Sequence, residues 1–294
     1  MSGFGDRVIA RCSKVGNPIC LGLDPRDALI PEGLSTDPVE RMRVFSERVI
    51  DLAAEKVAAI KPQAAFFEAW RSPGFAVFEH VCRYARDRGL LVIADVKRGD
   101  IGSTAAAYAE AYLTPTSDDP PLADAVTINA YLGSDGVRPF LEAGAAHGRG
   151  VFVLVKTSNP SSGELQDRDL AEGGTVCEHM ASLVTEWNTP RGESGYGPVG
   201  AVVGATYPEH LGRLREQLPG SIILLPGYGA QGAGAEDVVA AFDQRGHGAL
   251  VSASRSLTFP WAKEGHVPVD WEDRIVTAID RMREDLGRAL PQVT

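Results

Sequence analysis

The sequence is short of cysteine and of long apolar runs. Its 294 residues include four cysteines, which are Cys12, Cys20, Cys82 and Cys177. They form neither a C-x-x-C pair nor a disulfide framework, so we expect buried thiols and no zinc site. No run approaches the roughly 18 apolar residues of a membrane span, and the charged first residues carry no apolar segment of the kind a secretory signal needs. We therefore expect a cytoplasmic protein with no membrane partner.

Positive charge is also scarce, because 29 Lys and Arg face 39 Asp and Glu, for a net charge of −10. This balance disfavours a broad electrostatic grip on nucleic acid or anionic lipid. A small anionic ligand stays open, since it needs only a few local cations and backbone N–H groups. The sequence has no H-E-x-x-H motif, no G-x-S-x-G motif and no early G-x-G-x-x-G turn. We expect no metal and no cofactor.

What the sequence does contain is a series of short apolar runs separated by longer helical or loop stretches. Continuous apolar runs are typical of parallel strands covered on both faces, and helical periodicity between them favours alternating strands and helices. The eight runs are Ile19–Leu23, Val57–Ile60, Leu90–Ala94, Ala125–Ile128, Val151–Val155, Ala201–Val203, Ile222–Leu225 and Ala249–Val251. Eight such strands predict a (β/α)8 TIM barrel of the α/β class.

The stretches between the runs carry helix signals. Asp37, Pro38 and Glu40 predict an N-cap, a first-turn proline and a capping box, and apolar spacing predicts further helices over residues 73–88 and 175–187. The loop 114–121 and the long segment 157–198 interrupt the pattern, but strands resume after both. We therefore expect one barrel domain over residues 1–294.

Charged side chains follow several of the apolar runs. Asp24 follows the first run, Lys61 the second, and Asp95 and Lys97 the third. In a parallel barrel these positions meet at the carboxyl-terminal rim, where barrel active sites lie. One such charge alone is more often a helix cap or a solvated loop residue. Asp95 and Lys97 point the same way, because they are two residues apart on a strand, and the simplest alternative for them is a structural ion pair. With Lys61 and Asp100 added, the pattern predicts a Lys–Asp–Lys–Asp network that aims one ammonium at a substrate.

A glycine-rich segment follows the seventh run, at residues 225–232 (LPGYGAQG), and Arg255 follows the eighth. Glycine lets the backbone approach a ligand closely, and barrels often bind phosphate in the loops after strands seven and eight. A glycine-rich turn alone often only caps a helix. Beside an arginine, whose planar charged group suits phosphate, it favours phosphate binding.

Residues 95–104 (DVKRGDIGST) resemble the D-x-K-x-x-D-I-x-x-T signature of orotidine 5′-phosphate decarboxylases. Other segments that look like strand-end motifs of that family are 21–25 (LGLDP), 61–68 (KPQAAFFE), 157–160 (TSNP) and 226–232 (PGYGAQG). The chain length and the 61–68 block are similar to the longer bacterial branch of the family. The D-x-K-x-x-D pattern is shared with related phosphosugar barrels, whereas the whole set in this order is more specific.

The resemblance implies decarboxylation of orotidine 5′-monophosphate to uridine 5′-monophosphate, the last step of pyrimidine nucleotide synthesis. It implies that Lys97 donates a proton to C6, that Asp95 lies beside the departing carboxylate, and that Lys61 completes the charge network near the ribose. It also implies that Asp24 binds ribose hydroxyls and that Ser158 contacts the pyrimidine.

The resemblance further implies a phosphate site and a homodimer. Gln231 and Arg255 would hold the phosphate, with Pro226 shaping the loop. The residues that would reach into the partner subunit's site are Asp100, Ile101 and Thr104. Two other functions stay open: a related phosphosugar decarboxylase or aldolase, which usually needs magnesium to enolise its substrate, and a catalytically silent barrel that binds a nucleotide.

Overall fold

Eight parallel strands close on themselves in sequence order in the computed structural model of the chain, which describes residues 2–205, 208–229 and 232–291. The strands are β1 (Ile19–Leu23), β2 (Ala59–Pro62), β3 (Leu91–Arg98), β4 (Ala125–Ile128), β5 (Gly150–Lys156), β6 (Val199–Val203), β7 (Ile223–Pro226) and β8 (Ala249–Ala253). β1 pairs with β2 on one side and with β8 on the other, which closes the barrel. The predicted (β/α)8 barrel is confirmed.

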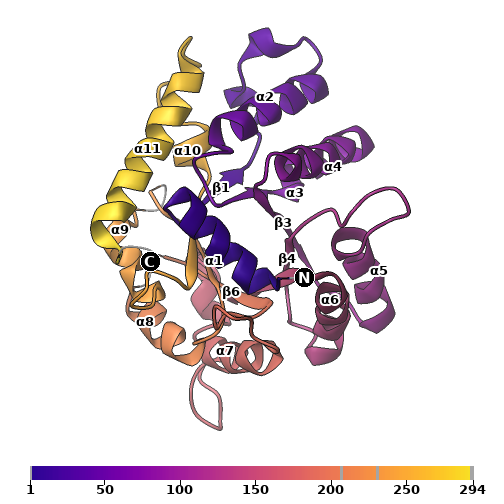
Figure 1. Ribbon diagram of the computed structural model, residues 1–294, viewed down its shortest axis with the longest axis vertical. Helices are drawn as coiled ribbons and strands as arrows, with labels where there is room; N and C mark the ends of the chain where they lie inside the picture. Colours follow the sequence, from indigo (N-terminus) through magenta and orange to yellow (C-terminus); the bar gives the residue numbers. More distant parts are fainter. Residues whose placement is uncertain (1, 206–207, 230–231, 292–294) are drawn as a thin grey trace.

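Helices surround the strands, and α1 lies across one end of the barrel (Figure 1). The α-helices are α1 (Phe4–Val15), α2 (Pro38–Ala53), α3 (Ala64–Glu68), α4 (Arg71–Asp87), α5 (Gly102–Leu113), α6 (Ser134–His147), α7 (Val176–Trp187), α8 (Pro208–Gln217), α9 (Ala235–Val238), α10 (Arg255–Thr258) and α11 (Trp271–Ala289). Short 3₁₀ turns are η1 (Asp27–Leu29), η2 (Glu32–Leu34), η3 (Pro160–Glu164) and η4 (Val239–Ala241).

The predicted helix start at Asp37 is confirmed in part. The Asp37 carboxylate accepts the backbone N–H of Val39 at 2.8 Å, as an N-cap does. The capping box does not form, because the Glu40 carboxylate instead accepts two hydrogen bonds from the Arg43 guanidinium at 2.6 and 2.8 Å. A charged partner within one turn is the stronger attraction for this carboxylate.

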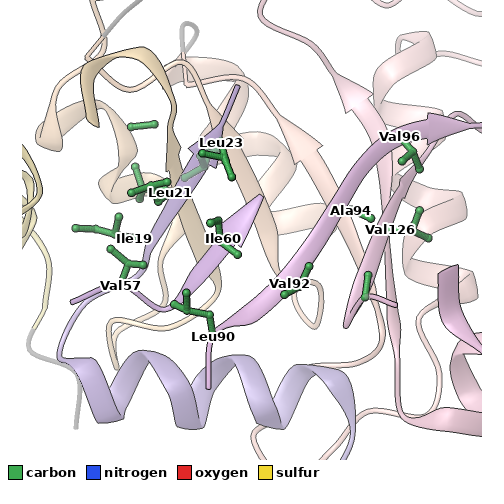
Figure 2. Close-up of a cluster of buried hydrophobic side chains, with 14 of the residues drawn as sticks. Ile19, Leu21, Leu23, Val57, Ile60, Leu90, Val92, Ala94, Val96 and Val126 are labelled. Atoms are coloured by element: carbon green, nitrogen blue, oxygen red, sulfur yellow. The ribbon is translucent and has the colours of Figure 1, made fainter. Parts of the chain in front are cut away.

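Alternate residues of each strand face opposite sides of the barrel wall, as the two-residue period of a strand requires. Ile19, Leu21 and Leu23 of β1 belong to the cluster that packs against the surrounding helices. Figure 2 shows this outward set continuing on the next strands through Ile60 and Val92. The alternate residues face the barrel interior, and those near the carboxyl-terminal ends of the strands line the cavity described below.

Five strands, β2, β3, β5, β7 and β8, run further than the apolar runs predicted, and two of them extend over the charged residues of the site. β2 spans Ala59–Pro62 and so includes Lys61, and β3 spans Leu91–Arg98 and so includes both Asp95 and Lys97. Charges at these positions are compatible with a strand because they face the interior opening, where they pair with one another.

Candidate active site

A cavity of about 500 Å³ opens at the carboxyl-terminal end of the barrel. Its floor consists of inward-facing strand residues, which are Lys61, Asp95, Thr127, Leu154, Val202, Leu224 and Ser252. Its walls come from residues at and just beyond the strand ends, which are Asp24, Arg26, Gln63, Lys97, Thr157, Ser158, Asn159, Pro226, Gly227, Tyr228, Ala253, Ser254 and Arg255. Seven strand ends therefore supply polar residues to one chamber, the usual construction of a barrel active site.

Asp95 is the centre of the floor and is almost fully buried. One carboxylate oxygen, Oδ2, accepts from the Lys61 ammonium at 2.6 Å and from the Gln63 amide at 2.9 Å. The other, Oδ1, accepts from the Lys97 ammonium at 2.5 Å and from the Thr127 hydroxyl at 2.9 Å. An ionised carboxylate has about four acceptor positions, so this one is saturated and fixed in orientation.

The charges of this cluster stabilise one another. Burial on its own would raise the pKa of Asp95, but the ammonium groups of Lys61 and Lys97 outweigh it and hold that pKa below the usual range of an aspartate. Burial would likewise lower the pKa of Lys61, but Asp95 and then Asp24 raise it above its ordinary value. The site therefore holds a buried carboxylate between two cations at neutral pH. Lys97, with 44% of its side chain exposed, is the cation open to a ligand.

Two glycines give the rim its shape. A Cβ at residue 204 would lie 2.9 Å from the Cβ of Ser158, so Gly204 lets the β5 end carry Ser158 against the neighbouring strand. A Cβ at residue 22 would lie 2.0 Å from the Oγ of Ser254. Both serines line the cavity. Glycine is required at residues 22 and 204 because a serine lies too close for a side chain, and not because of the backbone conformation.

The loop after β7 has the backbone conformation that its glycines allow. Gly227 and Gly229 have φ angles of +108° and +71°, a region that other residues rarely adopt. Pro226 and Gly227 line the cavity, and Arg255 lies at its rim from the start of α10. The two features predicted to bind phosphate are therefore on the same side of the cavity.

Most of the predicted site residues come together here. Those that line the cavity are Asp24, Lys61, Asp95, Lys97, Ser158, Pro226 and Arg255. The three that do not line it are Asp100, Ile101 and Thr104, which lie on the segment between β3 and the first turn of α5. Asp100 accepts the backbone N–H of Ile101 at 2.8 Å, so within one subunit the observed network is Lys61–Asp95–Lys97. Gln231 lies outside the described residues.

Other cavity residues were not predicted as site residues, and three of them bear on the charges of the site. Thr127 is a polar residue at an inward-facing position of β4, on the same face as Ala125, and its alternation with the outward-facing Val126 and Ile128 is the pattern that would have located it. Gln63 follows β2 directly and binds Asp95. Arg26 lies over the Phe66 ring, with 5.3 Å from its guanidinium carbon to the ring centroid, and adds a cation at the cavity wall.

Across residues 2–205, 208–229 and 232–291, no group of three or more His, Cys, Asp or Glu side chains is arranged to hold a metal ion. Within the same ranges, every helix is too short or too polar to cross a lipid bilayer. The four cysteines are all free and buried, as predicted.

Comparison with known proteins adds to this geometry. The sequence model of the orotidine 5′-phosphate decarboxylase / HUMPS family matches residues 17–259. The orotidine 5′-phosphate decarboxylase of Rhodopirellula baltica is 44% identical over 97% of this chain and 99% of its own length. That of Deinococcus radiodurans is 43% identical over 87% of this chain and 89% of its own length. The solved OMP decarboxylase of Leishmania donovani is 31% identical with a TM-score of 0.74, over 97% of this chain and 99% of that one.

Proposed function

The chain belongs to the orotidine 5′-phosphate decarboxylase / HUMPS family, and we propose that it converts orotidine 5′-monophosphate to uridine 5′-monophosphate and carbon dioxide, in the final step of pyrimidine nucleotide synthesis. It is a decarboxylase, a carbon–carbon lyase. The observation that supports the proposed substrate is the Lys61–Asp95–Lys97 chain of ion pairs, which runs from the floor to the wall of a cavity with Arg255 at its rim. Fixed charge at the reacting carbon and a cation for a phosphate are what this substrate requires.

In the proposed reaction, the bond between C6 and the carboxylate carbon breaks and its electron pair stays on C6. No adjacent π system accepts that charge, so the protein has to stabilise it by electrostatics. Lys97 supplies a positive charge at C6 and then gives C6 a proton, which it regains from solvent. Enzymes lower barriers by as much as about 23 kcal/mol, and we propose that this one does so without metal or cofactor.

The remaining cavity residues are assigned to substrate binding. Asp24 Oδ1 is buried without a hydrogen-bond partner in the described chain, so it is an acceptor available to a ribose hydroxyl. Ser158 is assigned to the pyrimidine, and Pro226, Gln231 and Arg255 to the phosphate. Binding the phosphate far from C6 helps because binding energy from a remote group can be used to order the reacting centre.

We also propose that two copies form a homodimer in which Asp100, Ile101 and Thr104 complete the partner's site. Supporting this, Ile101, which follows β3, is 61% exposed, and two other exposed apolar side chains, Tyr131 and Leu132, at 76% and 48%, follow the neighbouring strand β4. Apolar side chains gathered on one rim are typical of a protein interface. Asp100 in that arrangement would add the second carboxylate of the alternating network.

The test of the proposed chemistry is Lys97→Ala. Because this change removes the proton donor and leaves the binding residues in place, turnover should be abolished while uridine 5′-monophosphate still binds. Turnover is followed by ultraviolet absorbance and binding by calorimetry. Lys14→Ala is the matched control, since Lys14 is an exposed lysine in α1 at the other end of the barrel. Near-normal turnover by Lys97→Ala would overturn the assignment.

The wild-type assay is run in EDTA without added cofactor. Rapid turnover there supports cofactor-free decarboxylation and argues against magnesium-dependent relatives that enolise a sugar phosphate. A folded protein that binds uridine 5′-monophosphate but shows no turnover would instead favour a silent nucleotide-binding barrel.

A further inference from the structure

The position of Lys97 depends on an irregularity in β3. Ala94 pairs with Val126 of β4, but the next pair along is Arg98 with Ile128, so four steps of β3 advance against two of β4. A bulge of this kind leaves backbone groups without their ladder partners and redirects a side chain. Lys97 lies within it and has a φ of +46°, a left-handed conformation that costs a lysine free energy unless its surroundings enforce it.

Thr127 of β4 lies opposite the bulge and takes the place of the missing ladder. Its Oγ1 accepts the backbone N–H groups of Val96 and Lys97, both at 3.0 Å. The same hydroxyl donates to Asp95 Oδ1 at 2.9 Å. A hydroxyl has one donor and two acceptor positions, so all of its capacity is used. Because both acceptor positions are filled by N–H groups, its proton is committed to Asp95.

Thr127 therefore fixes two parts of the same ion pair. It holds the backbone from which the Lys97 side chain extends, and it holds Asp95 Oδ1, the oxygen to which the Lys97 ammonium is bonded. The side chain is 1% exposed, so water does not compete for these bonds. Regular strand pairing resumes just after, where the N–H of Asn129 bonds the carbonyl of Arg98 at 2.8 Å.

We propose that Thr127 is a positioning residue for the decarboxylation: its hydroxyl sets the bulge that aims Lys97 at the reacting carbon. This inference rests on the proposed function. Thr127 itself takes no part in the chemistry, because its only proton is donated to Asp95.

The test compares Thr127→Val, which keeps the branched shape and removes the hydroxyl, with Thr127→Ser, which keeps the hydroxyl. A displacement of about 1 Å in a catalytic group can cost about 100-fold in rate. We expect kcat to fall by about that factor in Thr127→Val, with KM and the affinity for uridine 5′-monophosphate unchanged, and Thr127→Ser to restore most of kcat. The control is Thr185→Val in α7, which removes a hydroxyl bonded to the Gln217 carbonyl at 2.6 Å, away from the cavity, and should leave kcat unchanged.

The outcomes separate this inference from the proposed function. No turnover by the wild type refutes the function itself. Wild-type turnover together with an equal kcat in Thr127→Val, or a loss that Thr127→Ser does not restore, overturns only the positioning role. If Thr127→Val does not fold, Thr127→Ala replaces it. Failure of both to fold while Thr127→Ser is active would assign the hydroxyl to stability and overturn the proposal.

Discussion

Asp95 shows how a buried charge is made permanent. Its four hydrogen bonds come from two ammonium groups, an amide and a hydroxyl, so no acceptor position remains for a substrate or a water molecule. A saturated carboxylate does not rotate to meet a ligand, and it does not take up a proton near neutral pH because Lys61 and Lys97 hold its pKa low against the effect of burial. In the proposed reaction, its role would be to present fixed negative charge.

This depressed pKa predicts how stability depends on pH. A carboxylate whose pKa is lower in the folded state stabilises the fold above its unfolded pKa, ordinarily 3.8, and loses that contribution as pH falls through the folded value. Asp95→Asn leaves Lys61 buried without its carboxylate and should lower the free energy of unfolding by about 3 kcal/mol near pH 7. Urea unfolding should show this gap from wild type closing below pH about 4. Parallel stability curves down to pH 2 would contradict it.

At the scale of elements, Lys156 binds the segment between β5 and α7, residues 157–175, to the end of β5. This lysine ends β5 and is 1% exposed, and its ammonium bonds Asp167 at 2.6 Å and Ser162 at 3.2 Å. Gln166 accepts the backbone N–H of Thr157 at 2.9 Å and donates to its hydroxyl at 2.8 Å. The segment therefore holds its ends together while its first residues form a cavity wall.

The two halves of this ion pair should respond unequally to mutation. Asp167→Ala removes a carboxylate from a buried ammonium, whereas Lys156→Met replaces the ammonium with an apolar chain and leaves a carboxylate that is 39% exposed and can be hydrated. We expect Asp167→Ala to lower the free energy of unfolding by about 2 kcal/mol more than Lys156→Met does. Urea denaturation of both variants measures this. Equal losses of unfolding free energy in the two variants would show that leaving the Lys156 ammonium buried without Asp167 is not the dominant cost.

The elements also show what the sequence could predict. The apolar runs located every strand of the barrel, because strands covered on both faces need apolar side chains on both. They placed the ends of several strands too early, and in β2, β3 and β5 the reason is a charged residue inside the strand. These residues, Lys61, Asp95 and Lys156, are tolerated there because partners elsewhere in the fold balance their charge. The proximity of Asp95 and Lys97 was expected from a regular strand, but it arises at a bulge with a left-handed lysine. No local pattern indicates that bulge, since the hydroxyl holding it comes from another strand.

At the scale of the whole molecule, the proposed dimer divides each site between two chains. Lys97 would come from one subunit and Asp100 from its partner, so a symmetric dimer would contain two such shared sites. The position of Asp100 outside the cavity of its own subunit agrees with this division.

The shared site predicts complementation between inactive variants. Lys97→Ala and Asp100→Ala are each expected to be inactive as homodimers. Their heterodimer contains one site with a native lysine and a native aspartate, and random pairing makes half of the dimers hybrid. Co-expressed chains should therefore regain about one quarter of wild-type activity. Activity that stays at the level of the separate variants would contradict the dimer proposal.

The position of helix α1 across one end of the barrel determines how substrate and products enter and leave the cavity. Its apolar residues, Phe4, Val8, Cys12 and Val15, pack onto the inward side chains at the amino-terminal end of the barrel. In the part of the chain that the structure describes, the cavity is therefore closed at this end. Orotidine 5′-monophosphate enters, and carbon dioxide and uridine 5′-monophosphate leave, through the opening at the carboxyl-terminal end. Bound uridine 5′-monophosphate blocks entry of the next substrate molecule, so its inhibition should be strictly competitive with orotidine 5′-monophosphate. Each turnover also includes the time that uridine 5′-monophosphate needs to leave the cavity.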